Sequence, residues 1–224
     1  MISKSPKVYT GEDVFDKVLE DIVHLLLEPG MLISENKMGR DFQVSRSVIR
    51  SAFGRLRQMG FIDILPQRGS YVSKIDANYI EDLLFLQSAI EKEAVNDILW
   101  NLGEQEQKVM IGELEAQLSQ QKIFAQEGGS YPEFMRLHRE FHRKIMEKAK
   151  RQRVMDIVGD NLLHLERYRH FEIAHTHITE HLLRENAEMI EVLQSRDFAF
   201  AVKKMNEHRD REVHLSRKLI EQYG

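Results

Sequence analysis

The segment from residue 29 to residue 72 reads PGMLISENKMGRDFQVSRSVIRSAFGRLRQMGFIDILPQRGSYV. Within it, Ser45 can cap a helix, because its hydroxyl accepts from the free backbone N–H groups of the first turn. The apolar residues that follow recur at i, i+3, i+4 and i+7, which is the period of one buried helix face. They are Ile49, Ala52, Phe53 and Leu56. Gly60 then ends the helix, since glycine adopts the left-handed conformation without strain.

The flanks of this helix predict the elements beside it. Residues 35–42 form a shorter helical segment, with Met38 and Phe42 at i and i+4, and residues 41–44 make the turn between the two helices. Two short helices at this separation indicate a helix-turn-helix, whose second helix enters the major groove of DNA. Residues 61–65 and 70–73 are β-prone and flank a turn. We therefore expect a two-stranded hairpin, or wing, after the recognition helix.

Charge supports a DNA-binding unit. From residue 36 to residue 75 there are eight Lys and Arg against two Asp and Glu, whereas the whole chain has a net charge of -4. Because DNA is bound chiefly through its phosphates, a local positive face matters more than the global sum. Taken singly, each arginine here could be part of an ordinary solvated helix face. Together with the capped helix, the turn and the hairpin, they favour DNA binding.

The pattern resembles the GntR family of bacterial transcription regulators. The matching residues are Pro29, Gly30, Leu32, Ser34, Glu35, Val44, Ser45, Arg46, Ile49, Arg50, Ala52, Arg55, Leu56, Gly60, Pro66, Arg68, Gly69 and Val72. They cover about a third of the chain.

The resemblance implies a role for individual residues. Arg46 and Arg50 would reach bases or adjacent phosphates, and Ser45 and Ser47 would hold phosphates at the start of the helix. Arg68 and Gly69 would contact the minor groove from the wing. Asn36 also belongs to the expected DNA-binding residues, because it occupies the position where many relatives carry an arginine that reads a base.

Length and composition set wider limits. A chain of 224 residues with 42% hydrophobic residues suits one large or two ordinary domains. The absence of cysteine excludes disulfides, thiolate zinc sites and a cysteine nucleophile. No segment has the apolar length of a signal peptide or a membrane span, so we expect a soluble cytoplasmic protein without membrane contact. Residues 12–27 predict a supporting helix that Pro29 and Gly30 stop.

Residues 76–224 predict a second domain. Residues 1–75 hold eleven Lys and Arg against nine Asp and Glu, whereas the remainder holds twenty-one against twenty-seven, which argues against a second DNA clamp. Apolar spacing is helical almost throughout residues 79–223. The fold class is therefore mainly α: a winged helix-turn-helix over residues 1–75, followed over residues 76–224 by an antiparallel all-helical bundle of about six helices.

Nine of the ten histidines lie in this second domain. His138 and His142 stand at i and i+4, so one helix face presents both imidazoles, a spacing that can bind a divalent metal but is common without one. The domain resembles the FCD effector-binding domain of the FadR-type branch of the GntR family. That resemblance implies a metal site formed by His138, His142, Asn186 and His208, with Zn²⁺ or Ni²⁺ as the ion. His138 and Asn186 depart from the aspartate and histidine of the family pattern.

The same resemblance implies a pocket beside the metal for a small-molecule effector, typically a carboxylate. Arg167 and Arg169 lie on a helix that could line the pocket, because a guanidinium fork suits a carboxylate. Gln87 stands where relatives often carry an arginine. Alternatively, these arginines belong to a solvated helix face.

Three functions remain open from the sequence. The first is a ligand-responsive, sequence-specific transcription regulator that binds a palindromic operator as a homodimer. The second is a metal-dependent helical-bundle enzyme, but only one Glu-x-x-His spacing is present, at Glu172 and His175, and no catalytic motif can be defended, so we expect no enzyme. The third is a DNA-binding dimer with a non-functional effector pocket.

Overall fold

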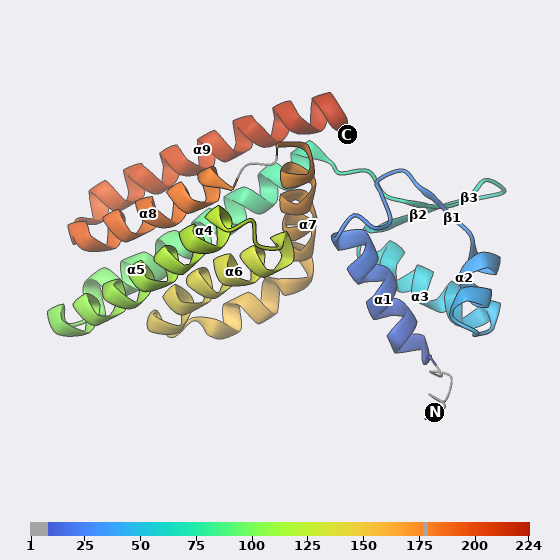
Figure 1. Ribbon diagram of the computed structural model, residues 1–224, viewed down its shortest axis with the longest axis horizontal. Coiled ribbons are helices and arrows are strands. Elements are labelled where there is room, and N and C mark those ends of the chain that lie inside the picture. The colour runs from blue at the N-terminus through green and yellow to red at the C-terminus, as the bar shows by residue number, and fades with distance from the viewer. Residues whose placement is uncertain (1–8, 177–178) are drawn as a thin grey trace.

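The computed structural model describes residues 9–176 and 179–224, and it divides into two parts along the chain. A small N-terminal part contains a sheet and short helices, and a larger C-terminal part is entirely helical (Figure 1). The mainly α fold class is thus confirmed.

The N-terminal part is a winged helix-turn-helix. Its elements are α1 (Gly11–Val23), β1 (Leu32–Ile33), α2 (Glu35–Asp41), α3 (Arg46–Gln58), β2 (Ile62–Leu65) and β3 (Gly69–Val72). The strands form one antiparallel sheet in the order β1-β3-β2. All four residues of the apolar stripe predicted in α3 are buried, and they pack with α1 and the sheet into one hydrophobic core.

Two details of this part differ from the sequence prediction. The predicted two-stranded hairpin is a three-stranded sheet, because Leu32 and Ile33 pair with Tyr71 and Ser70 of β3. A strand of two residues is too short to show an alternating pattern. The first helix ends at Val23 rather than at residue 27, since the chain turns after His24 and Leu25 adopts a left-handed φ of 60°.

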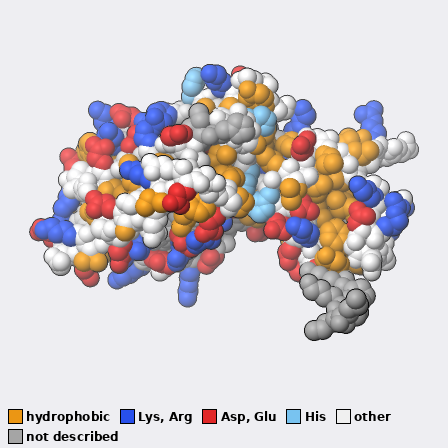
Figure 2. All heavy atoms as spheres, in the orientation of Figure 1, with side chains coloured by type: hydrophobic (Ala, Val, Ile, Leu, Met, Phe, Trp, Pro, Cys, Tyr) orange, Lys and Arg blue, Asp and Glu red, His pale blue; other side chains and the backbone are white. Residues whose placement is uncertain are grey.

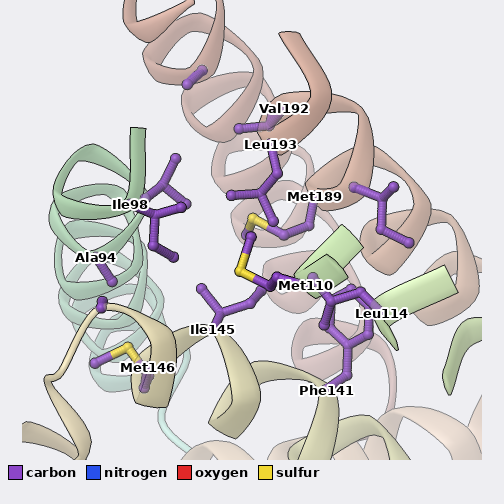
Figure 3. Packing of buried hydrophobic residues seen from close by; sticks show 14 of the residues in the cluster. Ala94, Ile98, Met110, Leu114, Phe141, Ile145, Met146, Met189, Val192 and Leu193 are labelled. Atoms are coloured by element: carbon purple, nitrogen blue, oxygen red, sulfur yellow. The ribbon is translucent and has the colours of Figure 1, made fainter. Parts of the chain in front are cut away.

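The C-terminal part holds six helices among the described residues. They are α4 (Ala77–Asn101), α5 (Glu104–Gln126), α6 (Tyr131–Lys148), α7 (Gln152–Thr176), α8 (Glu180–Ser195) and α9 (Phe198–Tyr223). Figure 3 shows the main core, in which Ile98, Phe141 and Leu193 converge from three different helices. Burial of such apolar faces stabilises each helix far more than its intrinsic propensity does.

Helix α7 connects the bundle to the DNA-binding part. Figure 1 shows α7 turning in its middle, so that its second half stands across the end of the bundle next to α1. The eight buried residues of α7 all lie in this half, between His164 and Glu172. The domain boundary predicted at residue 75 falls in the four-residue linker between β3 and α4. Among the described residues, no helix has the length and apolar character needed to span a membrane.

Candidate nucleic-acid interface and effector site

The N-terminal turn of α3 presents a polar, positively charged surface. Ser45 caps this helix by accepting from the Val48 backbone N–H, and its hydroxyl lies 2.7 Å from that of Ser47. The side chains of Arg46 and Arg50 are 60% and 65% exposed, so both can reach a partner. Figure 2 shows Lys and Arg side chains at this end of the molecule, as well as over the helical part. A helix start with free N–H groups and two arginines suits phosphate and base edges.

Glu35 of α2 orients these two arginines. Its carboxylate accepts from Arg46 Nε at 2.7 Å and lies 3.6 Å from an Arg50 nitrogen. The hydrogen bond from Arg46 holds the pKa of Glu35 below its usual range, so the carboxylate stays ionised at neutral pH. Arg46 is therefore held against the protein, whereas Arg50 is less constrained.

The wing places the other predicted DNA contacts. Arg68 is exposed in the turn between β2 and β3, and its carbonyl accepts from the Tyr71 hydroxyl. Gly69 has a φ of +112°, and a Cβ at this position would lie 3.0 Å from Leu32 Cδ1, so a larger residue would be strained. Asn36 is exposed in the first turn of α2.

Two adjoining cavities lie between helices of the C-terminal part. One, of about 470 Å³, opens between α4, α6 and α7, and the other, of about 40 Å³, lies between α4, α8 and α9. Four residues line both, namely Gln87, Glu91, His142 and Arg169. Gln87 and Arg169, both predicted for the effector pocket, are thus in the wall between the two cavities.

Arg169 is the centre of a buried ion-pair network. Its guanidinium lies 2.5 Å from a Glu212 oxygen, 3.2 Å from Glu172 and 3.5 Å from Glu185, with 7% of the side chain exposed. Burial alone would lower the pKa of Arg169, but the three carboxylates raise it well above its usual value. Burial and the neighbouring Glu212 raise the pKa of Glu185, because one cation cannot neutralise three carboxylates. The network ties α7 to α8 and α9.

The structure places the four predicted metal ligands in one region but not at one point. His138 Nδ1 lies 3.3 Å from Asn186 Nδ2, His142 Nδ1 lies 2.9 Å from a Glu91 oxygen, and His208 Nε2 lies 3.4 Å from a Glu185 oxygen. Among the described residues, three groups bring ligand atoms within 4.8 Å of one another, and none contains His138 or His142. His208 belongs to one of these groups, with Glu185 and Glu212.

The donors themselves fit a borderline metal such as Zn²⁺ or Ni²⁺. Both ring nitrogens of His142 are buried, and neither has the geometry of a hydrogen bond, although Nδ1 lies close to Glu91. Asn186 Oδ1 is buried without a hydrogen-bond partner. Burial lowers the pKa of His138 well below its ordinary value, with His142 and Arg169 adding to the effect, so that imidazole is neutral and has a lone pair to donate. A metal here would bring these donors together and supply a Lewis-acidic position for an anionic effector.

Arg167, also predicted for the effector pocket, lines neither of these two cavities. Its guanidinium donates to the Ser73 carbonyl at 2.7 Å and to the Ser73 hydroxyl at 3.2 Å. The reason is helical geometry, because residues two apart on a helix point in different directions. Arg169 faces the bundle, and Arg167 faces the linker.

Glu185 and Glu212 were not among the site residues predicted from the sequence. Glu212 follows the predicted ligand His208 by four residues, and Glu185 directly precedes Asn186. Glu212 therefore lies on the same helix face as His208, a spacing visible in the sequence. The pairing of both with Arg169 depends on the packing of three helices and left no comparable signal.

These features define a class of protein: a winged helix-turn-helix DNA-binding domain joined to a helical domain whose cavities adjoin a buried ion-pair network. Family comparison identifies residues 10–72 as the DNA-binding domain of the bacterial regulatory proteins of the gntR family, and residues 82–211 as an FCD domain. The chain belongs to the GntR family of transcription regulators. It binds DNA and regulates transcription, and the enzyme alternative has no support from its relatives.

Individual relatives agree with this assignment. The chain is 31% identical over 204 residues to the HTH-type transcriptional repressor RspR of Escherichia coli K12, covering 91% of this chain and 87% of RspR. It is 22% identical over 185 residues to the uncharacterized regulator YdhC of Bacillus subtilis, covering 82% and 80% of the two chains.

Solved structures share the fold. McbR/YncC of Escherichia coli superposes with a TM-score of 0.64 at 16% identity, over 97% of this chain and all of the other. Lar, described as controlling the expression of the Listeria monocytogenes agr system, gives 0.60 at 17% identity, over 96% and 99% of the two chains.

Proposed function

We propose that this regulator acts in the cytoplasm as a homodimer that binds a palindromic operator in a sequence-specific way, and that a small-molecule effector in the helical domain changes its affinity for DNA. The observation that supports operator binding is the exposed start of α3, where Arg46, Ser47 and Arg50 stand free of the helical part. A two-fold axis between two copies would place two such helices in successive major grooves.

The effector would bind in the larger cavity. Its volume of about 470 Å³ suits a small organic molecule, and apolar side chains of α6 and α7 line it together with His138, His142 and Arg169. Arg136, Arg139 and Arg143 follow one side of it along α6 and would favour a carboxylate. Arg169 lies on α7, three residues from Glu166 and two from Arg167, and Arg167 donates to Ser73, which directly follows β3. A shift of α7 on effector binding would therefore reach the DNA-binding domain directly.

Selection of DNA fragments from a random pool by the purified protein tests this function. We expect enrichment of an inverted repeat, and sedimentation analysis should show two chains for each operator. Screening small carboxylates against the protein–operator complex should then find one that changes the dissociation constant. A regulator that binds the repeat, and that no carboxylate affects, would instead support the DNA-binding dimer with a non-functional effector pocket.

The divalent metal is a separate part of the proposal. We expect His138, His142, Asn186 and His208 to hold about one Zn²⁺ or Ni²⁺ in each chain, since Asn186 Oδ1 is buried without a hydrogen-bond partner and the buried His142 ring lies next to Glu91. Metal analysis of protein incubated with either ion should show a loss of about one equivalent in His142→Ala. Equal metal content in the two proteins would contradict this site, while leaving the DNA-binding function intact.

A further inference from the structure

One face of α7 forms the contact between the two domains. His164, Arg167 and His170 recur every three residues, so they lie along the same side of the helix. His164 Nε2 lies 2.7 Å from the Met59 carbonyl oxygen, and its ring stacks on Phe61 at 3.9 Å. Arg167 bonds to Ser73, as described above. Figure 2 shows histidine side chains along this junction.

The third of these contacts has the composition of a metal site. His170 meets His24, which follows the last residue of α1, with the ring centroids 4.6 Å apart. Glu166 lies one helical turn before His170 on α7. One ligand atom from each of His24, Glu166 and His170 lies within 4.8 Å of the other two. Two imidazoles and a carboxylate from two domains therefore surround a single point.

His170 has the character of a ligand without a partner. Its side chain is buried, with 6% of the residue exposed, and Nε2 makes no hydrogen bond. Leaving a buried polar atom unpaired costs about 1–3 kcal/mol. Burial, and then the charges of His24 and Arg139, lower the pKa of His170 to about 4, so the ring is neutral at physiological pH. A neutral imidazole is the form that binds a metal.

Neighbouring side chains hold the cluster in place. Tyr131 packs edge-on against the His170 ring at 4.9 Å. Arg139 of α6 forms an ion pair with Glu166, which fixes the carboxylate next to His170. Arg139 is half exposed and can swing into solvent, so this ion pair need not compete strongly with a dication.

We propose that His24, Glu166 and His170 bind one divalent transition-metal ion, with Zn²⁺ and Ni²⁺ as the best matches for imidazole and carboxylate donors. This site is separate from the metal site proposed in the helical domain. His24 and His170 line neither of the two cavities of that domain, and Glu166 lines only the larger cavity. Three protein ligands leave at least one position for water. The bound ion would fasten the DNA-binding domain to α7, so metal supply would set how freely that domain can turn.

The test uses full-length protein stripped of metal and titrated with Zn²⁺ by calorimetry. We expect His24→Ala to lose about one equivalent of bound Zn²⁺ relative to the wild type, and His170→Ala to lose the same equivalent. His214→Ala is the matched control, because His214 is an exposed histidine of α9. His142→Ala separates the two sites: it should keep the interdomain equivalent even if it loses the other.

A second measurement reports on the domain junction itself. Hydrogen exchange in the linker, residues 73–76, and at the end of α1 should slow when Zn²⁺ is added to the wild type and should not change in His24→Ala. Unchanged Zn²⁺ stoichiometry in His24→Ala, or Zn²⁺ binding that leaves exchange at the junction unaltered, would overturn the proposal. Since His24 is only partly buried, its variant should fold even where His170→Ala does not.

Discussion

Replacement of Arg169 by methionine should lower the free energy of unfolding by about 3–5 kcal/mol. The substitution removes the only guanidinium that contacts Glu172, Glu185 and Glu212 within the described residues. It leaves the three buried carboxylates without this cation, although histidines still lie next to Glu172 and Glu185. Methionine has a similar length, so the loss would reflect charge rather than a cavity. Urea denaturation at pH 7 measures the change.

The control for this prediction is Arg136→Met. Arg136 pairs with Glu133 and Glu140 on the surface, with 46% of its side chain exposed, so its loss should cost at most about 1 kcal/mol. In Arg169→Met, the buried carboxylates would have raised pKa values, and their penalty would shrink as the pH falls from 7 towards the ordinary carboxyl pKa. Equal stability of the two variants at pH 7 would show that the network is not important for the fold.

Substitution of Arg50 by alanine should weaken operator binding by about 10- to 100-fold, which corresponds to about 1–3 kcal/mol. Arg50 is 65% exposed at the start of α3 and lies farther from Glu35 than Arg46 does, so most of its hydrogen-bonding capacity is available to DNA. If Arg50 contacts a base, the variant will also lose discrimination at one operator position. If it contacts a phosphate, affinity will fall evenly across sequences.

Lys108→Ala provides a comparison with the same change in net charge. Lys108 is 67% exposed on α5 and pairs with Glu104, on the helical domain. Fluorescence anisotropy with labelled operator should give a wild-type dissociation constant for this variant. A loss of affinity as large as that of Arg50→Ala would mean that overall charge, rather than the surface of α3, controls DNA binding.

Much of the fold could be predicted because its signals are local. The capping residue and apolar stripe of α3 define that helix within a few turns, and glycine or polar breaks separate the six helices of the second domain. The strand β1 could not be predicted in this way, since Leu32 and Ile33 become a strand only through hydrogen bonds with β3. The early end of α1 likewise follows from the turn at His24 and Leu25.

The candidate sites were less predictable, because they depend on which helix faces meet. Spacing within one helix placed His138 and His142 together. It could not show that Glu185 and Glu212 converge on Arg169, or that Arg167 turns towards Ser73. The interdomain cluster joins His24 to Glu166 and His170 across more than 140 residues of sequence, and no pattern in the chain connects them.

The linker between β3 and α4 is a very short tether. Four residues, 73–76, span at most about 14 Å when fully extended, and both ends of this tether are held, by the sheet and by the cap of α4. In a dimer, the helical domains would therefore set the distance between the two DNA-binding domains. Operator geometry, in the sense of the distance between half-sites, would then be encoded in the C-terminal domain, although no residue of that domain need touch DNA.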